Sequence, residues 1–366
     1  MYLEELRLAD FRSYGSLSLN LTPGVTVFVG ANGQGKTNIV EAVGYLATLR
    51  SHRTAVESPL IREGASRARI RGVVVDDGRT TSVDVDIIPG QANNAWINGV
   101  RVRRVREILG ICKAVVFSPE DLKLVRGDPA SRREYLDDLL VSLRPRYAAI
   151  RSEYERTVHQ RNAYLKETLK RPHRLDPSHL DVWDQQLCHA AEALLKARLS
   201  LTSSLAPLVE QAYAAVAGHH SVVRLEYRSS VPEALTTQEP EAAYLAAIHR
   251  LREAELARGI TLVGPHRDDL DIFLDDRPAR MYASHGEAWS LALALRLAAY
   301  EMFRRDGTRP ILVLDDVLAE LDSGRRQALT ETIDEAEQVL LTTAVDEDLP
   351  KATRFLVRAG EVRRVD

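Results

Sequence analysis

The chain has 366 residues, a formal net charge of −3 and a sequence pI of about 6.4. This length suits about two globular domains, and the charge excludes a protein coated in positive charge, as a histone-like binder is. Two cysteines in so long a chain exclude a disulfide framework and favour a reducing compartment. Early acidic residues and the lack of an apolar run of about 18 residues argue against a signal peptide and a membrane span. We therefore expect a cytoplasmic protein with no membrane contact.

The first 119 residues show the patterns of an α/β domain. Apolar or alternating runs predict strands at 2–8, 16–29, 68–88 and 114–117, the third of these as an antiparallel hairpin. A helix is expected at 39–49, directly after a glycine-rich turn.

Residues 120–220 change in character and become rich in Glu, Arg, Ala and Leu, and a strand and a further helix follow before residue 260. Their periodicity predicts helices and one strand, at 129–143, 146–170, 179–217, 240–258 and, for the strand, 222–227. No heptad repeat is sustained, which argues against a long coiled coil.

From about residue 260 the alternation of strands and helices resumes. The expected elements are strands at 272–274, 311–314 and 338–341, helices at 286–304 and 323–336, and a hairpin at 354–365. We therefore predict an α/β domain with a mixed sheet and flanking helices, made of residues 1–119 and 260–366. A mainly helical second domain, residues 120–259, is inserted into it.

A phosphate-binding loop is predicted at Gly30-Ala31-Asn32-Gly33-Gln34-Gly35-Lys36-Thr37, which matches G-x-x-x-x-G-K-[ST] between a strand and a helix. Its glycines let backbone N–H groups point at phosphate oxygens, and the following helix adds its positive end. Lys36 is expected to reach the β- and γ-phosphates, and the Thr37 hydroxyl to bind Mg²⁺. Lys36 is the only lysine before residue 113, in a chain where 42 of 49 basic residues are arginine. The alternative is a glycine turn that simply caps a helix.

Two carboxylates, Asp315 and Asp316, end the apolar run 311–314. A carboxylate at a buried strand end beside a phosphate loop commonly holds the Mg²⁺ shell, and we assign this role to Asp315. Asp316 is placed to orient or activate an attacking water. The alternative is a solvated loop start, or a cap for the next helix. The following Ala319-Glu320-Leu321-Asp322 also fits a helix N-terminus capped by Asp322.

A second anion site is suggested at Ser284 and Gly286, whose amides precede the apolar helix 288–300. The spacing of Ser284 and Glu287 equally fits a plain capping box, and the residues alone favour this cap.

The order of these motifs resembles the ATP-binding heads of the ABC, SMC and RecF group. Three long stretches are more specifically similar to RecF, a family of bacterial DNA replication and repair proteins: 119–137, Leu262-Val263-Gly264-Pro265-His266-Arg267-Asp268-Asp269-Leu270, and 314–329. Phe11-Arg12-Ser13-Tyr14 and Ser51-His52-Arg53-Thr54 are also similar.

The resemblance implies that residues 30–37 bind ATP and Mg²⁺, with Arg12 near the nucleotide and with Lys36 and Asp316 in the catalytic machinery. Ser284 and Gly286 would contact the γ-phosphate of ATP held by a second protomer, so that ATP joins two heads. The family motif reads Ser-Gln-Gly-Gln, whereas this chain has Glu287 at its fourth position, where an acid would repel phosphate.

The resemblance also implies an activity. This activity is a weak hydrolysis of ATP that depends on Mg²⁺ and is stimulated by DNA. The protein would be cytoplasmic and would serve recombinational repair, replication restart and the SOS response. An ATP-dependent homodimer would clamp double-stranded or gapped DNA and act with RecR and RecO to load the RecA recombinase, and slow hydrolysis would reset it. Two rivals stay open: an ATP-binding scaffold without turnover, and another P-loop phosphotransferase such as a small-molecule kinase.

Any DNA contact must be local, because the net charge is negative. The candidate basic clusters are Arg101, Arg103, Arg104 and Arg106; Arg144, Arg146 and Arg151; and Arg161, Lys166, Lys170, Arg171 and Arg174. The alternative for each cluster is a solvated helix face in which acids pair with the bases.

Overall fold

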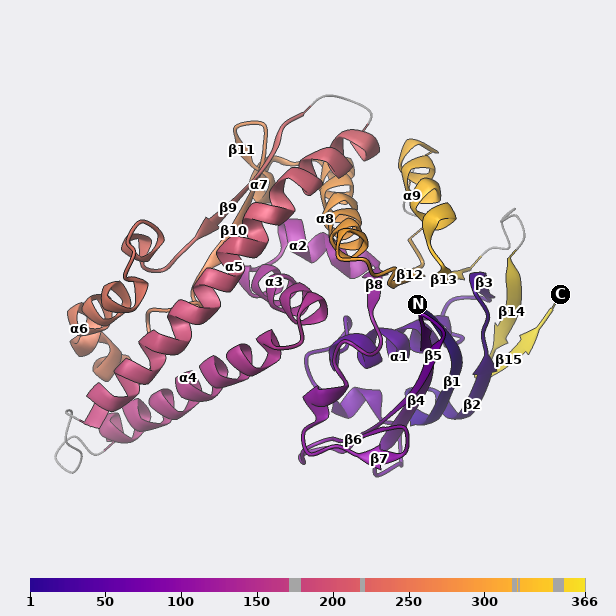
Figure 1. Ribbon diagram of the computed structural model, residues 1–366, viewed down its shortest axis with the longest axis horizontal. Coiled ribbons are helices and arrows are strands. Elements are labelled where there is room, and N and C mark those ends of the chain that lie inside the picture. Colours follow the sequence, from indigo (N-terminus) through magenta and orange to yellow (C-terminus); the bar gives the residue numbers. More distant parts are fainter. Residues whose placement is uncertain (171–178, 218–220, 318–320, 322, 345–351, 366) are drawn as a thin grey trace. The chain divides into compact units, whose positions relative to one another are not determined.

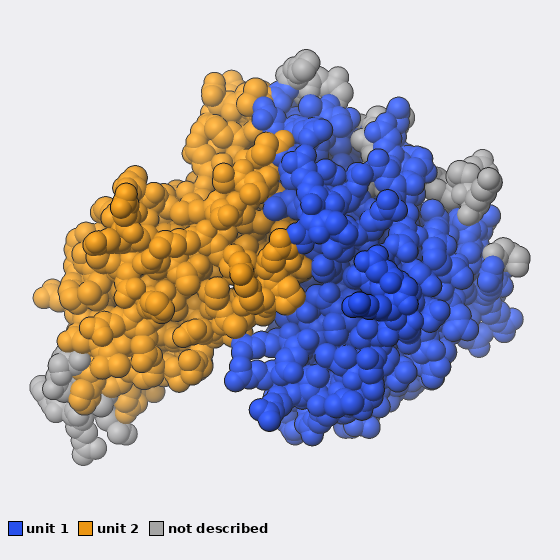
Figure 2. All heavy atoms as spheres, viewed as in Figure 1, with its two compact units in different colours: residues 1–125, 208–221, 284–366 blue, residues 126–207, 222–283 orange. Residues whose placement is uncertain are grey.

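The computed structural model describes residues 1–170, 179–217, 221–317, 321, 323–344 and 352–365 (Figure 1). The chain divides into two compact units, which are coloured separately in Figure 2. Unit 1 comprises residues 1–125, 208–221 and 284–366, and unit 2 comprises residues 126–207 and 222–283. In the part of the chain that is described, no helix is long and apolar enough to cross a membrane.

Unit 1 contains an antiparallel six-stranded sheet with the order β2-β1-β4-β5-β6-β7. Its strands are β1 Tyr2–Phe11, β2 Tyr14–Asn20, β4 Ala68–Asp76, β5 Arg79–Ile87, β6 Asn94–Ile97 and β7 Val100–Arg101. The predicted hairpin is confirmed, since β4 and β5 pair from Ala68–Ile87 to Asp76–Arg79 around a two-residue turn. Alternate residues of β4 are buried, as expected for a sheet with one face on a core.

A second six-stranded sheet in unit 1 has the order β15-β14-β3-β13-β12-β8. Its strands are β3 Gly24–Val29, β8 Ala114–Phe117, β12 Ile311–Asp315, β13 Gln338–Thr343, β14 Thr353–Arg358 and β15 Glu361–Arg364. All neighbouring pairs are parallel except β14–β15. The single strand expected at 16–29 is wrong: β2 and β3 belong to different sheets. Pro23, just before β3, has no N–H for a sheet ladder.

Helix α1 Lys36–Thr48 packs against strands of both sheets and is buried along almost its whole length. One hydrophobic core joins residues of α1 to residues of the two sheets, including Leu6, Val43 and Leu340. A helix that is apolar on all sides is stable only where protein surrounds it. This arrangement fixes the N-terminus of α1 at the carboxyl end of β3.

The remaining helices of unit 1 include α8 His285–Arg305 and α9 Ser323–Glu335, both of which were expected from the sequence. α8 is buried over most of its length and packs against β8. Four short helical segments also occur in the first part of the chain: η1 Ser58–Leu60, η2 Val105–Ile108, η3 Pro119–Asp121 and α2 Leu122–Arg126.

Unit 2 is mainly helical. Its elements are α3 Pro129–Leu143, α4 Tyr147–Lys170, α5 His179–Ala217 as far as Pro207, η4 Pro232–Leu235, α6 Pro240–Arg258 and α7 Ala279–Tyr282, with the sheet β11-β10-β9. The strands are β9 Val223–Arg228, β10 Asp269–Leu274 and β11 Arg277–Pro278. Residues 260–283 group with this unit rather than with residues 284–366, because β10 pairs along its full length with β9.

Candidate nucleotide-binding site

The predicted phosphate loop connects the carboxyl end of β3 to the N-terminus of α1, which is the context the motif requires (Figure 1). Gly33 and Gly35 have φ values of 80° and 108°, a region that glycine adopts without steric cost. Tyr14 donates a hydrogen bond from its hydroxyl to the Gly35 carbonyl, at 3.1 Å. The loop therefore has the curled backbone that exposes N–H groups to an anion.

The loop is fixed from its other side by the end of β13 and by the C-terminal hairpin β14–β15. The Gly30 N–H donates to the Thr343 carbonyl at 3.2 Å, and a Cβ on Gly30 would lie 2.3 Å from the Val357 carbonyl oxygen. The Ala359 N–H donates to Oε1 of Gln34 at 2.6 Å. Strand β14 thus leaves no room for a side chain at the first position of the loop.

Lys36 is only 3% exposed and turns back along the loop. Its Nζ donates to the carbonyls of Gly30 at 2.8 Å and Ala31 at 3.2 Å. Among the described residues, Nζ of Lys36 donates only to these neutral carbonyls, and a buried ammonium held in this way favours an anion within the loop.

Thr37 and Asp315 are 278 positions apart in the sequence but meet at the sheet edge. Thr37 Oγ1 donates to Asp315 Oδ1 at 2.9 Å, and Thr342 Oγ1 donates to the same oxygen at 2.7 Å. The contact arises because β13 lies between β3 and β12, so that all three strands end at the same edge. The hydroxyl and carboxylate oxygens gathered here are of the type that Mg²⁺ prefers.

The pKa values of the two neighbouring carboxyl groups, Asp315 and Asp316, are shifted in opposite directions. Burial acts to raise the pKa of Asp315, but nearby His52 and the hydrogen bonds from Thr342 and Thr37 outweigh it and hold this pKa below its usual value. Burial raises the pKa of Asp316, and the charge of Asp315 adds to the rise while Lys36 opposes it. Asp315 is thus kept as an anion, whereas Asp316 is the better proton acceptor.

Arg12 contacts the helix that follows the loop. Its guanidinium donates to Glu41 on α1, from Nε at 2.8 Å and from Nη2 at 2.5 Å, and to the Pro59 carbonyl at 2.9 Å. Glu41 is fully buried and also accepts from Ser51 Oγ at 2.5 Å. The expected position of Arg12 near a nucleotide stays a prediction, because its described contacts anchor α1.

Sequence reasoning did not assign a role to His52 or Thr342. His52 Nε2 lies 3.8 Å from Asp315 Oδ2, and both of its ring nitrogens are buried without a hydrogen-bond partner. Thr342 also accepts a hydrogen bond from the Asp316 N–H at 2.9 Å. His52 lies within a family-like stretch, and this was its only signal in the sequence. Thr342 carried none beyond its place at the end of a predicted strand.

Ser284 caps α8, as the spacing of Ser284 and Glu287 predicted. The Ser284 N–H donates to Glu287 Oε2 at 2.7 Å, and the Glu287 N–H donates to Ser284 Oγ at 3.3 Å. The capping box is therefore confirmed. A Cβ on Gly286 would lie 2.8 Å from Nη2 of Arg325, which donates from Nε to Ser290 Oγ. Glu320, Asp322, Arg171 and Arg174 lie outside the described residues.

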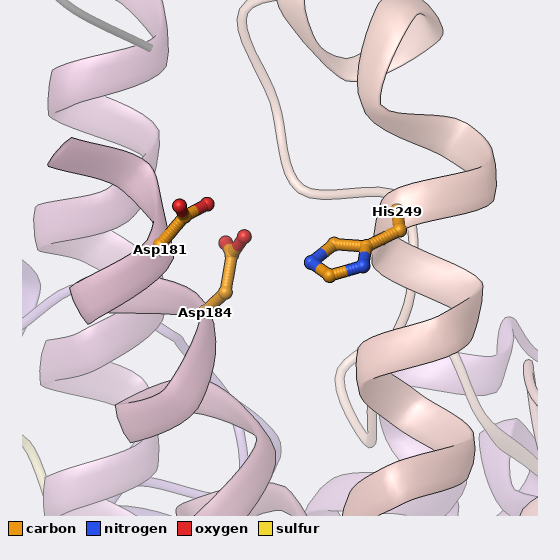
Figure 3. A group of neighbouring side chains, drawn as sticks. All are labelled: Asp181, Asp184 and His249. Carbon is orange, nitrogen blue, oxygen red and sulfur yellow. The ribbon is translucent and has the colours of Figure 1, made fainter. Parts of the chain in front are cut away.

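Unit 2 holds a separate group of possible metal ligands, Asp181, Asp184 and His249 (Figure 3). Their ligand atoms lie within 4.8 Å of one another. Arg252, however, already donates to both carboxylates, and fully buried Arg161 donates to Asp184 Oδ1 at 2.8 Å. Two guanidinium groups balance the negative charge, so this group is an ion-pair network rather than a metal centre.

Comparison with known proteins agrees with the order of motifs. The model of the RecF/RecN/SMC N-terminal domain family matches residues 2–363. The DNA replication and repair protein RecF of Acidothermus cellulolyticus is 56% identical over 371 residues, covering 100% of both chains, and that of Streptomyces avermitilis is 51% identical over 373 residues with the same coverage. The chain belongs to the RecF family.

Solved RecF structures have the same fold. The recombination mediator protein RecF bound to ATP, from the RecFOR pathway, is 25% identical, with a TM-score of 0.91 over 100% of this chain and 98% of that one. An Smc head bound to the C-terminal winged-helix domain of ScpA is 19% identical with a TM-score of 0.57, which shows a shared fold. The expected ABC-type ATPase head is therefore confirmed for this RecF-family chain.

Proposed function

We propose that this chain is an ATP-dependent DNA-binding protein of recombinational repair and replication restart, with a weak, Mg²⁺-dependent ATPase activity that DNA stimulates. Its support is the name that the RecF relatives carry and the RecF-ATP structure that shares its fold. Residues 1–119 and 260–366 are proposed as the ATPase head and 120–259 as the inserted arm, although residues 260–283 group with most of the arm in unit 2.

The residues of the loop fit ATP and Mg²⁺. Backbone amides of the loop, apart from the Gly30 N–H that donates to Thr343, hold the phosphates, and buried Lys36 neutralises their charge. Thr37 and Asp315, whose oxygens already lie 2.9 Å apart, hold the metal. When bound, Mg²⁺ neutralises charge on the phosphate oxygens.

Asp316 is proposed to orient the attacking water and accept its proton. Its backbone φ of 51° is left-handed, and its N–H is tied to Thr342 Oγ1, so the carboxylate is held on a fixed turn. Burial raises its pKa, which makes it a better base than Asp315. Asp is one methylene shorter than Glu, which suits slow hydrolysis that times release.

Two protomers are proposed to close when ATP binds, with Ser284 and Gly286 of one head meeting the nucleotide of the other. The capping box bears on the unusual Glu287 of this chain. Its carboxylate accepts the Ser284 N–H at 2.7 Å, so this acid is turned into its own helix N-terminus. The negative charge that would repel phosphate is thus engaged within the cap.

The closed dimer is proposed to hold double-stranded or gapped DNA in the cytoplasm. It would act with RecR and RecO in loading RecA, and we place it in the SOS response. The RecFOR pathway named for the RecF-ATP structure supports these partners.

The observation that carries the proposal is the contact between Thr37 and Asp315 beside buried Lys36. The test is the mass of the protein in solution, by light scattering, with and without ATP, Mg²⁺ and a gapped duplex. Lys36→Ala is expected to abolish the ATP-dependent rise in mass. Lys196→Ala, which removes an exposed lysine of α5, serves as the control and should dimerise normally. An unchanged mass of the natural protein with ATP would refute the clamp.

A further inference from the structure

An exposed group of arginines lies at one end of the antiparallel sheet of unit 1. Strand β7 is the last strand of this sheet and pairs only with β6. We call Arg101, at the end of β7, and Arg103, Arg104 and Arg106, in the segment after it, the basic edge. Arg101, Arg103 and Arg104 are exposed, and Val100 beside them is 70% exposed.

The basic edge differs from the other arginines of the same sheet. On β4 and just before it, Arg67 and Arg69 donate to Asp86 on β5, and Arg71 pairs with Asp84. These arginines have their charge balanced across strands. Among the described residues, the arginines of the basic edge form no ion pair, and Arg101 donates only to the side chain of Asn94.

The local sequence also lacks the acids that would neutralise this edge. Residues 87–106 contain no Asp or Glu. Glu107 follows directly, but its Oε1 accepts the backbone N–H of Arg104 at 2.9 Å and so caps η2. Four positive charges therefore lie next to a single acid, Glu107, which leaves a local excess of positive charge in a protein whose net charge is −3. Such a local field attracts a polyanion.

The spacing suits a ligand with closely repeated negative charges. The four arginines lie within six residues, which would span at most about 20 Å even if fully extended, and duplex DNA carries one charge per about 1.7 Å of its axis. Guanidinium groups bind phosphate oxygens in a bidentate manner. Trp96 on β6 is the cross-strand partner of Arg101, and the guanidinium of Arg69 already lies over its ring, 5.1 Å from the ring centre. This arrangement favours contacts with the backbone of a duplex over stacking on unpaired bases.

We propose that the basic edge binds the phosphate backbone of duplex DNA. This inference rests on the proposed function and locates one DNA contact on the antiparallel sheet. The contact is independent of base sequence, since backbone contacts carry no sequence information directly.

The test is the salt dependence of duplex binding with ATP and Mg²⁺, measured by fluorescence anisotropy. Each phosphate contact contributes about 0.9 to the slope of log affinity against log salt concentration. Replacing Arg101, Arg103 and Arg104 together by alanine should lower the slope by about 2 to 3 and weaken binding at low salt. The control replaces three exposed arginines that are paired with acids, Arg7, Arg304 and Arg305, and should leave the slope unchanged.

A variant with lysine at the same three positions of the edge shows whether the alanine variant fails because it has lost charge or because it has misfolded. It keeps the positive charges and should restore most of the slope. An alanine variant that binds duplex with the natural slope and affinity overturns this inference, while the proposed function stands if the natural protein binds DNA. Failure of the natural protein to bind any duplex with ATP refutes the proposed function itself.

Discussion

The close approach of β14 to the phosphate loop makes Gly30→Ala an informative substitution. A Cβ at position 30 would lie 2.3 Å from the carbonyl oxygen of Val357, whereas real Cβ atoms essentially never come within 3.0 Å of another atom. The loop or β14 must therefore move by about 0.7 Å, the difference between these distances. The obstacle is backbone, which is paired to β3 at Phe355 and Leu356, so it cannot rotate away as a side chain can.

Overpacking of this kind costs about 1–3 kcal/mol of folding stability. A shift of this size in the loop should also weaken ATP binding by about tenfold or more, because losing one hydrogen bond to a charged group costs about 1.5–3 kcal/mol. Both effects are measurable, by urea unfolding followed by circular dichroism and by titration of the folded protein with a fluorescent ATP analogue and Mg²⁺.

Gly24→Ala is the matched control at the opposite end of β3. Gly24 has a φ of 96°, so alanine is strained there, but no atom lies within 4 Å of the added Cβ. This variant should lose stability by about 1–2 kcal/mol and bind ATP normally. If Gly30→Ala keeps the natural stability and ATP affinity, β14 does not confine the loop as described.

Two further outcomes follow from the neighbouring carboxylates. Asp316→Asn should bind ATP and DNA but release phosphate far more slowly, because asparagine accepts the left-handed backbone yet cannot take a proton; loss of ATP binding would show that Asp316 has another role. The pKa of Asp315 is lower in the folded protein than in the unfolded chain, so its carboxylate stabilises the fold at any pH above the unfolded pKa. This stability is lost as the pH falls through the pKa of the folded state. Urea midpoints should therefore fall more steeply below about pH 4 in the natural protein than in Asp315→Asn, and parallel curves would contradict the assignment.

Local patterns predicted most elements of this fold. The phosphate loop, the strand ending in Asp315 and the capping box of Ser284 depend on residues close together in sequence, and the sequence was sufficient to locate them. The long helices of unit 2 were found for the same reason.

Partners far apart in the sequence could not be predicted from local patterns. The division of the first domain into two sheets depends on strand pairing, and Pro23 gave only a local hint that 16–29 is interrupted. The ion pair of Arg12 with Glu41, and the place of His52 beside Asp315, depend on where α1 packs. Periodicity reports which face of an element is buried but not which element covers it.

The position of β3 in its sheet has a consequence for synthesis of the protein. Residues 24–29 leave the ribosome early, yet both neighbours of β3 come from the last part of the chain, residues 338–358. Asp315, the partner of Thr37, is also made late. The loop is therefore made well before the residues that complete it, so the proposed nucleotide site can form only after Asp315, β13 and β14 have been synthesised.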